Sequence, residues 1–478
     1  MTRAPLTSLL ALSVILSGCG GSGGGGSAPV VATTGPSGAP APSAGCTLRD
    51  RQDWAAAQLR EWYLFPETLP ASLDPATYTS VQAYVDALTA TARGQRRDRN
   101  FTYVTSIAQE NAFYASGSSA GFGIRLSTDG AAGRVFVAEA FEGAPALAQG
   151  IDRGTEILAI GTNAGDLRTV RSIITAEGGG GVTAALGPNT AGVTRVLRVT
   201  DGAGQRDVTV SKADYALAPV SERYGARIIE DGGRQVGYVN LRTFISTADA
   251  PLRNAFATFR ARNVTDVIID VRYNGGGLVS IAELVGDLLG RARTGSEALN
   301  YTTYRPEKAS RNSTRLFQPR AESIAPTRVA FIGTAATASA SELIVNDQIP
   351  YLRANAALIG TNTFGKPVGQ IAVDRAACDD RLRIVAFATQ NAARQGNYFD
   401  GLATVVEASC QAADDLGRPL GDPAEGSVRA ALDFIAGRPC NRISVGDAGT
   451  LSTRSEGKRE LLTPANPDTA QREVPGLF

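Results

Sequence analysis

Two segments of the sequence carry residues that together could do nucleophilic chemistry. Ser339 stands between an apolar β-type run, Arg328–Ile332, and a helical pattern. A serine at such a strand-to-helix turn lies near unpaired N–H groups and the helix dipole, which favour a developing negative charge. Lys366 lies in a later loop, and a lysine that burial keeps neutral can accept the serine proton. Gln370, four residues after Lys366, could hold that amine in place.

Histidine is absent from all 478 residues of the sequence. Its absence excludes Ser-His-Asp and Cys-His mechanisms, imidazole metal ligands and histidine proton shuttles. Lys+Arg 47 and Asp+Glu 46 give a formal net charge of +1, and no dense basic stripe is present, so nucleic acid is not an expected partner. Any acid–base chemistry must therefore use lysine, carboxylates, tyrosine, cysteine or backbone groups.

Three loops at the ends of predicted strands would bring these residues together. The strand runs are Thr265–Val271, Arg328–Ile332 and Ala357–Gly360. Because ligands of open α/β sheets bind at the carboxyl ends of strands, one site could use all three loops. The first loop, Gly275-Gly276-Gly277, carries no side chains, so its backbone could form an oxyanion hole with the N–H of Ala340. We expect an α/β catalytic core, a mixed sheet with flanking helices.

The third loop also fits the first seven positions of a phosphate-binding P-loop, Gly360–Lys366. The eighth position is Pro367, which has neither a hydroxyl for magnesium nor an N–H for phosphate. In addition, Val368–Val373 has the pattern of a strand, where a P-loop requires a helix. The sequence therefore disfavours nucleotide binding, and no cofactor or metal is expected.

A region of short β-type runs lies between the helical N-terminal segment and the predicted core. Its Gly121-Phe122-Gly123-Ile124 run precedes a strand and resembles the glycine loop of a PDZ domain. By that resemblance Gly121, Phe122, Gly123 and Ile124 would bind a peptide tail, which adds to the sheet edge as a strand. The alternative is a generic small β-barrel with a glycine turn.

The sequence predicts six parts, of which three are folded domains. The fold class is an α/β core plus an inserted PDZ-like β-rich domain and a small N-terminal helical domain. The parts are a signal peptide (1–18), a tether (19–45), the helical domain (46–112), the PDZ-like domain (113–213), the catalytic core (214–445) and a flexible C-terminal tail (446–478).

The amino terminus has the pattern of an export signal, with Arg3 before the apolar stretch Leu6–Leu16. Leu16-Ser17-Gly18-Cys19 resembles the bacterial lipoprotein signal, in which the cysteine becomes the lipidated first residue of the mature protein. The sequence therefore predicts a lipid-anchored protein of the bacterial cell envelope, held to the outer membrane through Cys19 and facing the periplasm. Residues 19–45, rich in Gly, Ser and Pro, would form a flexible tether. The alternative is an ordinary secretory signal with a chance cysteine.

Four cysteines remain when Cys19 is set aside. They are Cys46, Cys378, Cys410 and Cys440. In an exported protein this even number predicts two disulfides, for which three connectivities are possible. A zinc site made of all four cysteines is the alternative, but no two of them are closely spaced.

Three motifs together resemble the signature of the carboxyl-terminal processing, or tail-specific, serine proteases. They are DVRYNGGG at Asp270–Gly277, ASASE at Ala338–Glu342 and TFGKPVGQ at Thr363–Gln370. The resemblance implies that Ser339 is the nucleophile, Lys366 the general base and Gln370 its orienting partner. It also implies that Gly276 and Ala340 are the oxyanion donors.

The same resemblance implies a serine endopeptidase of the cell envelope that recognises protein carboxyl-terminal tails. It would cleave peptide bonds with a Ser-Lys dyad through an acyl-enzyme, so protein or peptide tails are the expected substrates. The alternative is a non-catalytic tail-binding protein on the same fold. The presence of Ser339, Lys366 and Gln370 together favours the enzyme.

Residues 446–478 lose apolar periodicity, which predicts a flexible tail. The last five residues, Val474–Phe478, turn apolar again and end in a hydrophobic side chain beside a free carboxylate. A PDZ-like groove accepts such an end by strand addition. We therefore predict that the tail occupies the protein's own groove or is trimmed by a neighbouring copy. The alternative is a disordered tail that ends in Leu-Phe by chance.

Overall fold

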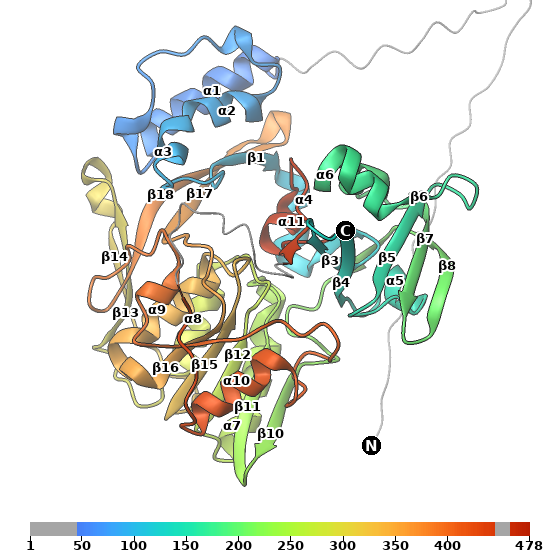
Figure 1. The fold of residues 1–478 in the computed structure, drawn as a ribbon. Helices are drawn as coiled ribbons and strands as arrows, with labels where there is room; N and C mark the ends of the chain where they lie inside the picture. Colours follow the sequence, from blue (N-terminus) through green and yellow to red (C-terminus); the bar gives the residue numbers. More distant parts are fainter. Residues whose placement is uncertain (1–44, 445–458) are drawn as a thin grey trace, which may run out of the picture. The chain divides into compact units, whose positions relative to one another are not determined.

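The computed structural model describes residues 45–444 and 459–478. The predicted signal peptide, Cys19 and the tether up to residue 44 lie outside the described residues. Figure 1 shows the elements coloured in chain order. Within the described part of the chain, no helix has both the length and the apolar character of a membrane span.

The predicted catalytic region contains a six-stranded sheet of order β10-β11-β12-β15-β16-β19. β10 is antiparallel to β11, and all the other neighbours are parallel, so the sheet is mixed. Its strands are β10 (Ala226–Asp231), β11 (Arg234–Asn240), β12 (Asp266–Asp270), β15 (Arg328–Gly333), β16 (Ala356–Gly360) and β19 (Ala408–Gln411). The three strand runs expected from the sequence are β12, β15 and β16. The predicted α/β fold class is confirmed.

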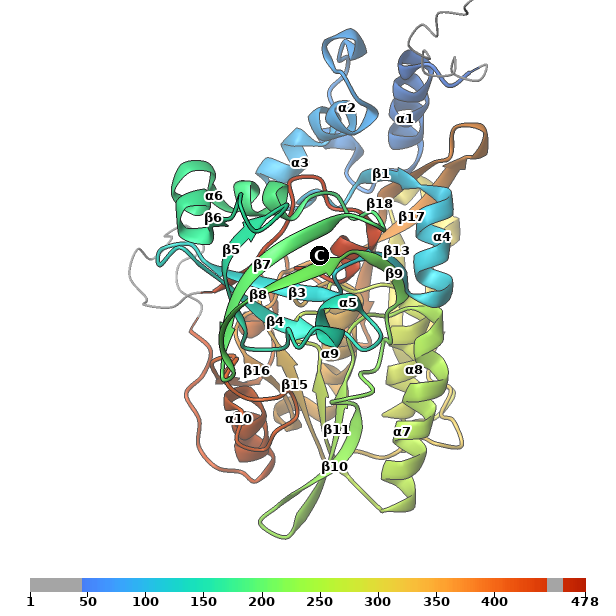
Figure 2. The same ribbon diagram turned by 90° about the vertical axis from the view of Figure 1, so that its right-hand side faces the viewer.

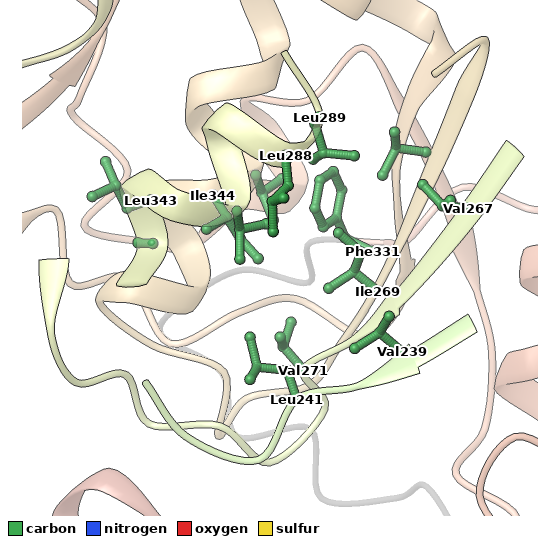
Figure 3. Close-up of a cluster of buried hydrophobic side chains, with 14 of the residues drawn as sticks. Val239, Leu241, Val267, Ile269, Val271, Leu288, Leu289, Phe331, Leu343 and Ile344 are labelled. Atoms are coloured by element: carbon green, nitrogen blue, oxygen red, sulfur yellow. The ribbon is translucent and has the colours of Figure 1, made fainter. Parts of the chain in front are cut away.

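Helices cover both faces of this sheet. Successive residues of a strand point to opposite faces, so each strand packs against both layers of helices. Val267 and Ile269 of β12 belong to the large hydrophobic cluster of Figure 3. That cluster includes residues of α7 (Asp249–Ala261), α8 (Val279–Leu288) and α9 (Ala340–Leu352). Ile268, between them in sequence, packs instead with α10 (Gly426–Ile435). The parallel strands are therefore buried on both faces, which explains their continuous apolar sequence.

A second sheet joins the N-terminal helices to the core. Its order is β1-β18-β13-β14, and β17 pairs with β18. The strands are β1 (Tyr103–Ser106), β13 (Ala298–Tyr304), β14 (Ser313–Leu316), β17 (Val368–Arg375) and β18 (Asp380–Asn391). The helices are α1 (Leu48–Trp62), α2 (Val81–Leu88), α3 (Ala90–Gly94) and α4 (Ile107–Ser116). Leu59 of α1 and Val85 of α2 share a hydrophobic cluster with Leu382 and Ile384 of β18. These two helices therefore pack against the sheet that carries Gln370.

The β-rich domain, residues 118–216, has a sheet of its own, which Figure 2 shows in the foreground. The order is β20-β3-β4-β5-β7-β8, with β6 paired to β5, and β2 pairs separately with β9. The elements within the domain are β2 (Ser118–Gly121), β3 (Ile124–Asp129), β4 (Arg134–Ala140), α5 (Pro145–Ala148), β5 (Glu156–Gly161), β6 (Arg168–Thr169), α6 (Val170–Leu186), β7 (Thr194–Asp201), β8 (Gly204–Ser211) and β9 (Ala213–Ala216). β20, which completes the sheet, comes from the far end of the sequence.

The C-terminal residues 459–478 are folded, so the prediction of a flexible tail over 446–478 is wrong for this part. They form β20 (Glu460–Leu461) and α11 (Thr469–Glu473). Val474, Leu477 and Phe478 are buried. Their side chains leave water by packing against distant parts of the chain, contacts that apolar periodicity within the segment does not reveal. Residues 446–458 of the predicted tail lie outside the described residues.

Two disulfides are present, as the cysteine count predicts. Cys46 pairs with Cys378 and Cys410 pairs with Cys440. The first bond connects the residues before α1 to the β17–β18 connection, across 332 positions of sequence. The second connects the end of β19 to the segment after α10. The structure thereby selects one of the three connectivities that the sequence left open.

We predict that peptide mapping without reductant finds these two pairings. Replacing Cys410 and Cys440 by serine should lower the free energy of unfolding by about 2–4 kcal/mol, because the unfolded chain regains the freedom of the opened loop. Chemical denaturation with and without reductant measures the effect. Equal stability of the two proteins under oxidising conditions would contradict the prediction, and reductant should abolish the difference between them.

Candidate active site

Ser339 occupies a tight turn between β15 and α9. Its φ of +56° lies in a region that residues with a side chain rarely adopt. Neighbouring hydrogen bonds maintain the turn: the Ala338 N–H donates to the Asn274 carbonyl over 3.0 Å, and the Leu343 N–H donates to the Ser339 carbonyl over 2.8 Å. Ser339 is half-buried. The turn therefore presents the hydroxyl at a helix N-terminus, as the sequence predicts.

The buried carboxylate of Glu342 ties this turn to the loop that carries Lys366. One oxygen accepts the N–H of Ser339 at 3.1 Å and the N–H of Lys366 at 2.7 Å. The other accepts the Thr363 hydroxyl at 2.6 Å and the Gly365 N–H at 2.7 Å. Burial raises the pKa of the Glu342 carboxyl, although all four hydrogen bonds oppose that shift. Glu342 thus fixes the backbones of the candidate nucleophile and base relative to each other.

The Lys366 amine lies among apolar and amide groups. Its Nζ donates to Oε1 of Gln370 over 2.9 Å and lies 5.0 Å from the centre of the Phe101 ring. The Gln370 amide is held in turn by the Phe101 carbonyl, which accepts its Nε2–H. Burial lowers the pKa of the Lys366 amine, and the carboxylates of Glu473 and Asp98 oppose this shift. A larger fraction of the amine is therefore neutral than in an ordinary lysine.

The candidate nucleophile and base share this site without a direct bond. Among the described residues, no hydrogen bond joins the Lys366 amine to the Ser339 hydroxyl. In enzymes without substrate, catalytic hydrogen bonds are often long and shorten only when substrate binds. The Glu342 contacts place the two residues in one site, and the amine in this state is paired with Gln370.

The expected oxyanion donors lie beside Ser339, but one of them is engaged. A Cβ on Gly276 would come within 2.8 Å of the Ser339 Cβ and 3.3 Å of the Ala340 nitrogen, so the three residues meet closely. The Gly276 N–H, however, donates to Oδ1 of Asn274 over 2.9 Å. In this conformation the side chain two residues earlier therefore satisfies the Gly276 N–H, which would have to leave Asn274 before it could bind an oxyanion. The Ala340 N–H is the first of α9, a position without an acceptor in the helix.

The Gly121–Ile124 run leads from the last residue of β2 to the first residue of β3. The N–H groups of Gly123 and Ile124 both donate to the main-chain oxygen of Phe478, over 2.9 and 3.2 Å. A Cβ on Gly121 would lie 2.9 Å from the Phe478 carbonyl carbon. The ring of Phe122 is buried in the core of the β-rich domain. All four predicted residues thus surround the end of a peptide segment, which belongs to the same chain.

Buried arginines connect the β-rich domain to the glycine loop of the core. Arg125 of β3 donates to the Tyr273 carbonyl over 2.5 Å. Arg153 donates to the Tyr273 hydroxyl over 3.0 Å and pairs with Asp414 at 2.7 Å. Tyr273 precedes Asn274, the residue that holds the Gly276 N–H. A displacement of β3 would therefore be transmitted through these bonds to the glycine loop.

The root of the glycine loop is fixed by a fully buried arginine. Arg272 pairs with Asp270 at 2.8 Å and with Glu425 at 2.9 Å. These carboxylates raise the pKa of the Arg272 guanidinium well above its ordinary value and outweigh the opposing effect of burial. Glu425 also caps α10 by accepting the Val428 N–H. Arg272 also donates to Asp414 over 3.1 Å, and no sequence pattern indicates Asp414 or Glu425 as its partners, because they lie 142 and 153 positions away.

Two further features were not predicted from the sequence. They are the bridging hydrogen bonds of Glu342 and the hydrogen bond from the Gly276 N–H to the Asn274 side chain. A signal for the first was available, since Ser339 and Glu342 form the Ser-x-x-Glu pattern of a capping box. The pattern predicts the bond from Glu342 to the Ser339 backbone. It does not predict the three bonds to the Thr363–Lys366 loop, which depend on the packing of α9 against that loop.

The P-loop alternative for Gly360–Lys366 does not fit the structure. The residues after Lys366 form strand β17, where a phosphate-binding loop would continue into a helix. Across residues 45–444 and 459–478, no three Cys, Asp or Glu side chains gather in a group that could hold a metal ion. The site is built from backbone N–H groups, a serine, a lysine, amides and the bridging carboxylate of Glu342.

Parts of this chain are similar to known protein families and proteins. The family described as "Peptidase family S41" matches residues 235–395, and "Peptidase S41 N-terminal domain" matches residues 51–103. "Carboxyl-terminal-processing peptidase 3, chloroplastic" of Arabidopsis thaliana is 28% identical over 257 residues, which cover 53% of this chain and 46% of that protein. "Carboxyl-terminal-processing protease" of Picosynechococcus sp. is 28% identical over 251 residues, covering 52% of this chain and 55% of that one. The matches thus span about half the length of these relatives.

The fold has a similar solved counterpart. A putative S41 protease from Bacteroides fragilis superposes with a TM-score of 0.61 at 23% identity, covering 80% of this chain and 97% of that one. The fold is therefore similar to that of this solved protein. Together with the two family matches, this confirms the resemblance to the carboxyl-terminal processing proteases that the motifs predict.

We predict that Glu342→Ala lowers the free energy of unfolding by about 3 kcal/mol or more. The substitution leaves the N–H groups of Ser339, Gly365 and Lys366 without an acceptor in a buried place, and each lost bond costs about 1–3 kcal/mol. Chemical denaturation measures the change. The control is Glu307→Ala, whose side chain is 67% exposed and which should change stability little. A Glu342→Ala protein within 1 kcal/mol of the wild type would contradict the bridging role.

Proposed function

We propose that this chain, which resembles the S41 carboxyl-terminal processing peptidases in motifs and fold, is a serine endopeptidase that cleaves proteins recognised by their carboxyl-terminal tails. Ser339 is the nucleophile and Lys366 the general base, with Gln370 orienting the amine. The observation that carries the proposal is the buried Lys366 amine, whose lowered pKa and bond to Gln370 suit a base. Glu342 accepts the backbone N–H groups of Ser339 and Lys366 and so fixes the two backbones relative to each other.

In the proposed reaction, Ser339 Oγ attacks the carbonyl carbon of the scissile peptide bond while the neutral Lys366 amine takes the hydroxyl proton. The negative charge on the carbonyl oxygen is stabilised by the Ala340 N–H, and by the Gly276 N–H once it turns from Asn274. The intermediate collapses, the lysine ammonium gives its proton to the leaving amine, and an acyl-enzyme remains. Water then attacks the ester with Lys366 again as base, which releases the acid and restores Ser339.

The β-rich domain supplies the tail-binding groove in this proposal. A PDZ-like groove binds an extended chain along a strand edge, and the β3 edge here already accepts a chain segment in that manner. Gly121, Phe122, Gly123 and Ile124 form its closed end. The Arg125 and Arg153 bonds to Tyr273 would couple an occupied groove to the glycine loop.

We also propose that the protein works in the bacterial cell envelope, anchored to the outer membrane through a lipidated Cys19. The proposal rests on the amino-terminal sequence, and the two disulfides support an oxidising compartment. Metabolic labelling with a palmitate analogue, compared between the wild type and Cys19→Ser, tests it. Equal labelling of both proteins would refute the anchor.

We predict that Ser339→Ala and Lys366→Ala each reduce cleavage of an unfolded test protein by about 10³-fold or more. Because the two residues act as one unit, the double variant should lose no further activity. Lys308→Ala, at a half-buried lysine that pairs with Glu61 outside the site, is the control and should retain activity. Melting temperatures establish that each variant is folded.

A serine-reactive fluorophosphonate probe separates this enzyme from a non-catalytic tail-binding protein. The wild type should be labelled and Ser339→Ala should not. A folded wild type that neither reacts with the probe nor cleaves any test protein would favour the non-catalytic alternative.

We further predict that kcat/KM rises with pH through an inflection below 10.5, the ordinary lysine value. Burial lowers the pKa of Lys366, so the active neutral amine forms at lower pH than in a free lysine, and protonation below that pKa removes activity. Initial rates across the pH range, with melting temperature measured in the same buffers, give the profile. A kcat/KM that falls as pH rises while the fold is intact would contradict a lysine base.

A further inference from the structure

The segment that ends at Phe478 pairs with β3 in the same way as an added strand. Phe478 and Ile124 exchange hydrogen bonds in both directions, at 2.9 and 3.2 Å. The Leu126 N–H donates to the Gly476 carbonyl over 2.8 Å, and Leu477 faces Arg125 as an antiparallel partner. The pairing extends over three consecutive residues of the segment. It uses the backbone groups of β3 that a substrate tail would need.

The side chain of Phe478 fills the apolar end of the groove. It is 1% exposed and belongs to the hydrophobic cluster that contains Phe122, Ile124 and Leu126. Gly121 allows the approach, because a Cβ at that position would lie within 3.0 Å of the Phe478 carbonyl group. Both the backbone and the side-chain parts of the groove are therefore filled.

The same segment also covers the glycine loop beside Ser339. The Gly275 N–H donates to the Glu473 carbonyl over 3.0 Å. A Cβ on Gly275 would come within 2.3 Å of the Arg472 carbonyl oxygen and 3.1 Å of Pro475. Gly275 precedes Gly276, which lies against Ser339. One stretch of ten residues, Thr469–Phe478, thus contacts both the groove and the edge of the candidate active site.

Contacts with other parts of the chain hold this stretch in place. The Tyr114 hydroxyl of α4 donates to the Glu473 carboxylate over 2.9 Å, and Figure 1 shows α11, in red, beside α4. Val474 and Leu477 share a hydrophobic cluster with Phe113, Phe141, Tyr215 and Ile245. That cluster draws on the helical segment, the β-rich domain and the core, so the stretch is a packed part of the fold.

We propose that Thr469–Phe478 is a built-in ligand which fills the tail groove and covers the glycine loop, so that a substrate tail binds only by displacing it. The inference rests on the proposed function, since the displacing partner is an extended protein tail with an apolar end. The substrate and the built-in ligand compete for the same bonds to Gly123, Ile124 and Leu126. The free protein is thereby held in a closed state until a tail arrives.

The covalent connection makes this competition strong. A tethered segment has an effective concentration of about 1 mM, so even an intrinsic Kd of about 0.1 mM leaves the groove about nine-tenths occupied. The apparent Kd for a free tail equals its intrinsic Kd divided by the fraction of grooves that are open, so it rises about tenfold or more. Weakening the built-in ligand should recover this factor.

The test uses the Ser339→Ala protein, so that binding is measured without cleavage. The probe is the peptide Arg-Glu-Val-Pro-Gly-Leu-Phe, which copies residues 472–478 and carries a fluorophore at its amino end. Phe478→Asp empties the apolar end of the groove without altering the groove itself. Fluorescence anisotropy should show that this variant binds the peptide at least tenfold more tightly than the parent. A peptide that ends in Asp should bind neither protein.

Leu316→Asp is the matched control, since it makes the same kind of change at a side chain that is 39% exposed in β14, and it should bind like the parent. A second variant, lacking residues 474–478, guards against Phe478→Asp remaining docked through Val474 and Leu477. Equal peptide affinity in the parent and in both folded variants would overturn the proposal. So would a parent dimer that Phe478→Asp dissociates, because the segment would then fill the groove of a second copy.

The outcome is independent of the proposed chemistry. If Ser339→Ala and Lys366→Ala leave cleavage unchanged, the protease assignment fails, but the peptide-exchange measurement is unaffected. If cleavage follows the dyad and the variants show no gain in peptide affinity, only the built-in ligand is refuted.

Discussion

One buried carboxylate determines whether the candidate active site exists as a unit. Glu342 accepts hydrogen bonds from the turn that carries Ser339 and from the loop that carries Lys366. The turn needs such support because Ser339 has a φ of +56°, a conformation that costs about 1–3 kcal/mol. The loop needs it because its N–H groups lie in a buried place, where an unpaired donor is costly. The serine turn and the lysine loop are thus assembled around a carboxylate to which the proposed reaction assigns no step.

A second layer of charges supports the glycine loop. Arg272 is buried and is fixed by carboxylates on both sides, while Arg125 and Arg153 reach the adjacent Tyr273 from the β-rich domain. Buried ion pairs of this kind contribute little net stability, but removing one partner leaves an uncompensated charge. Their geometry therefore specifies one arrangement of the two domains around the loop. The loop itself has no room for side chains, since a Cβ would meet a backbone oxygen at 2.3 Å on Gly275 and at 2.4 Å on Gly277.

Sequence patterns predicted the local parts of this architecture well. The continuous apolar run at Thr265–Val271 predicted a strand buried on both faces, and the loops after three strands predicted which residues would meet. The Lys366 to Gln370 spacing predicted a contact that the structure contains. What could not be predicted depends on partners far away in sequence. The disulfide pairing, the Glu425 partner of Arg272 and the folded state of residues 459–478 all require knowledge of the tertiary arrangement. The Asn274 side chain redirects the Gly276 N–H through a local turn that the glycine pattern does not reveal.

The pairing of β3 also has a consequence for the behaviour of the protein in solution. β3 borders its sheet, and β20 together with residues 476–478 covers its free backbone groups. An uncovered strand at a sheet border is a template on which other chains can assemble into aggregates. In the proposed function the groove binds extended chains, so this border has to remain available and the hazard remains with it. While residues 476–478 are paired with β3, the backbone groups of this edge are not available to other protein molecules. In this proposal, resistance to aggregation and binding of a tail depend on the same few backbone groups of β3.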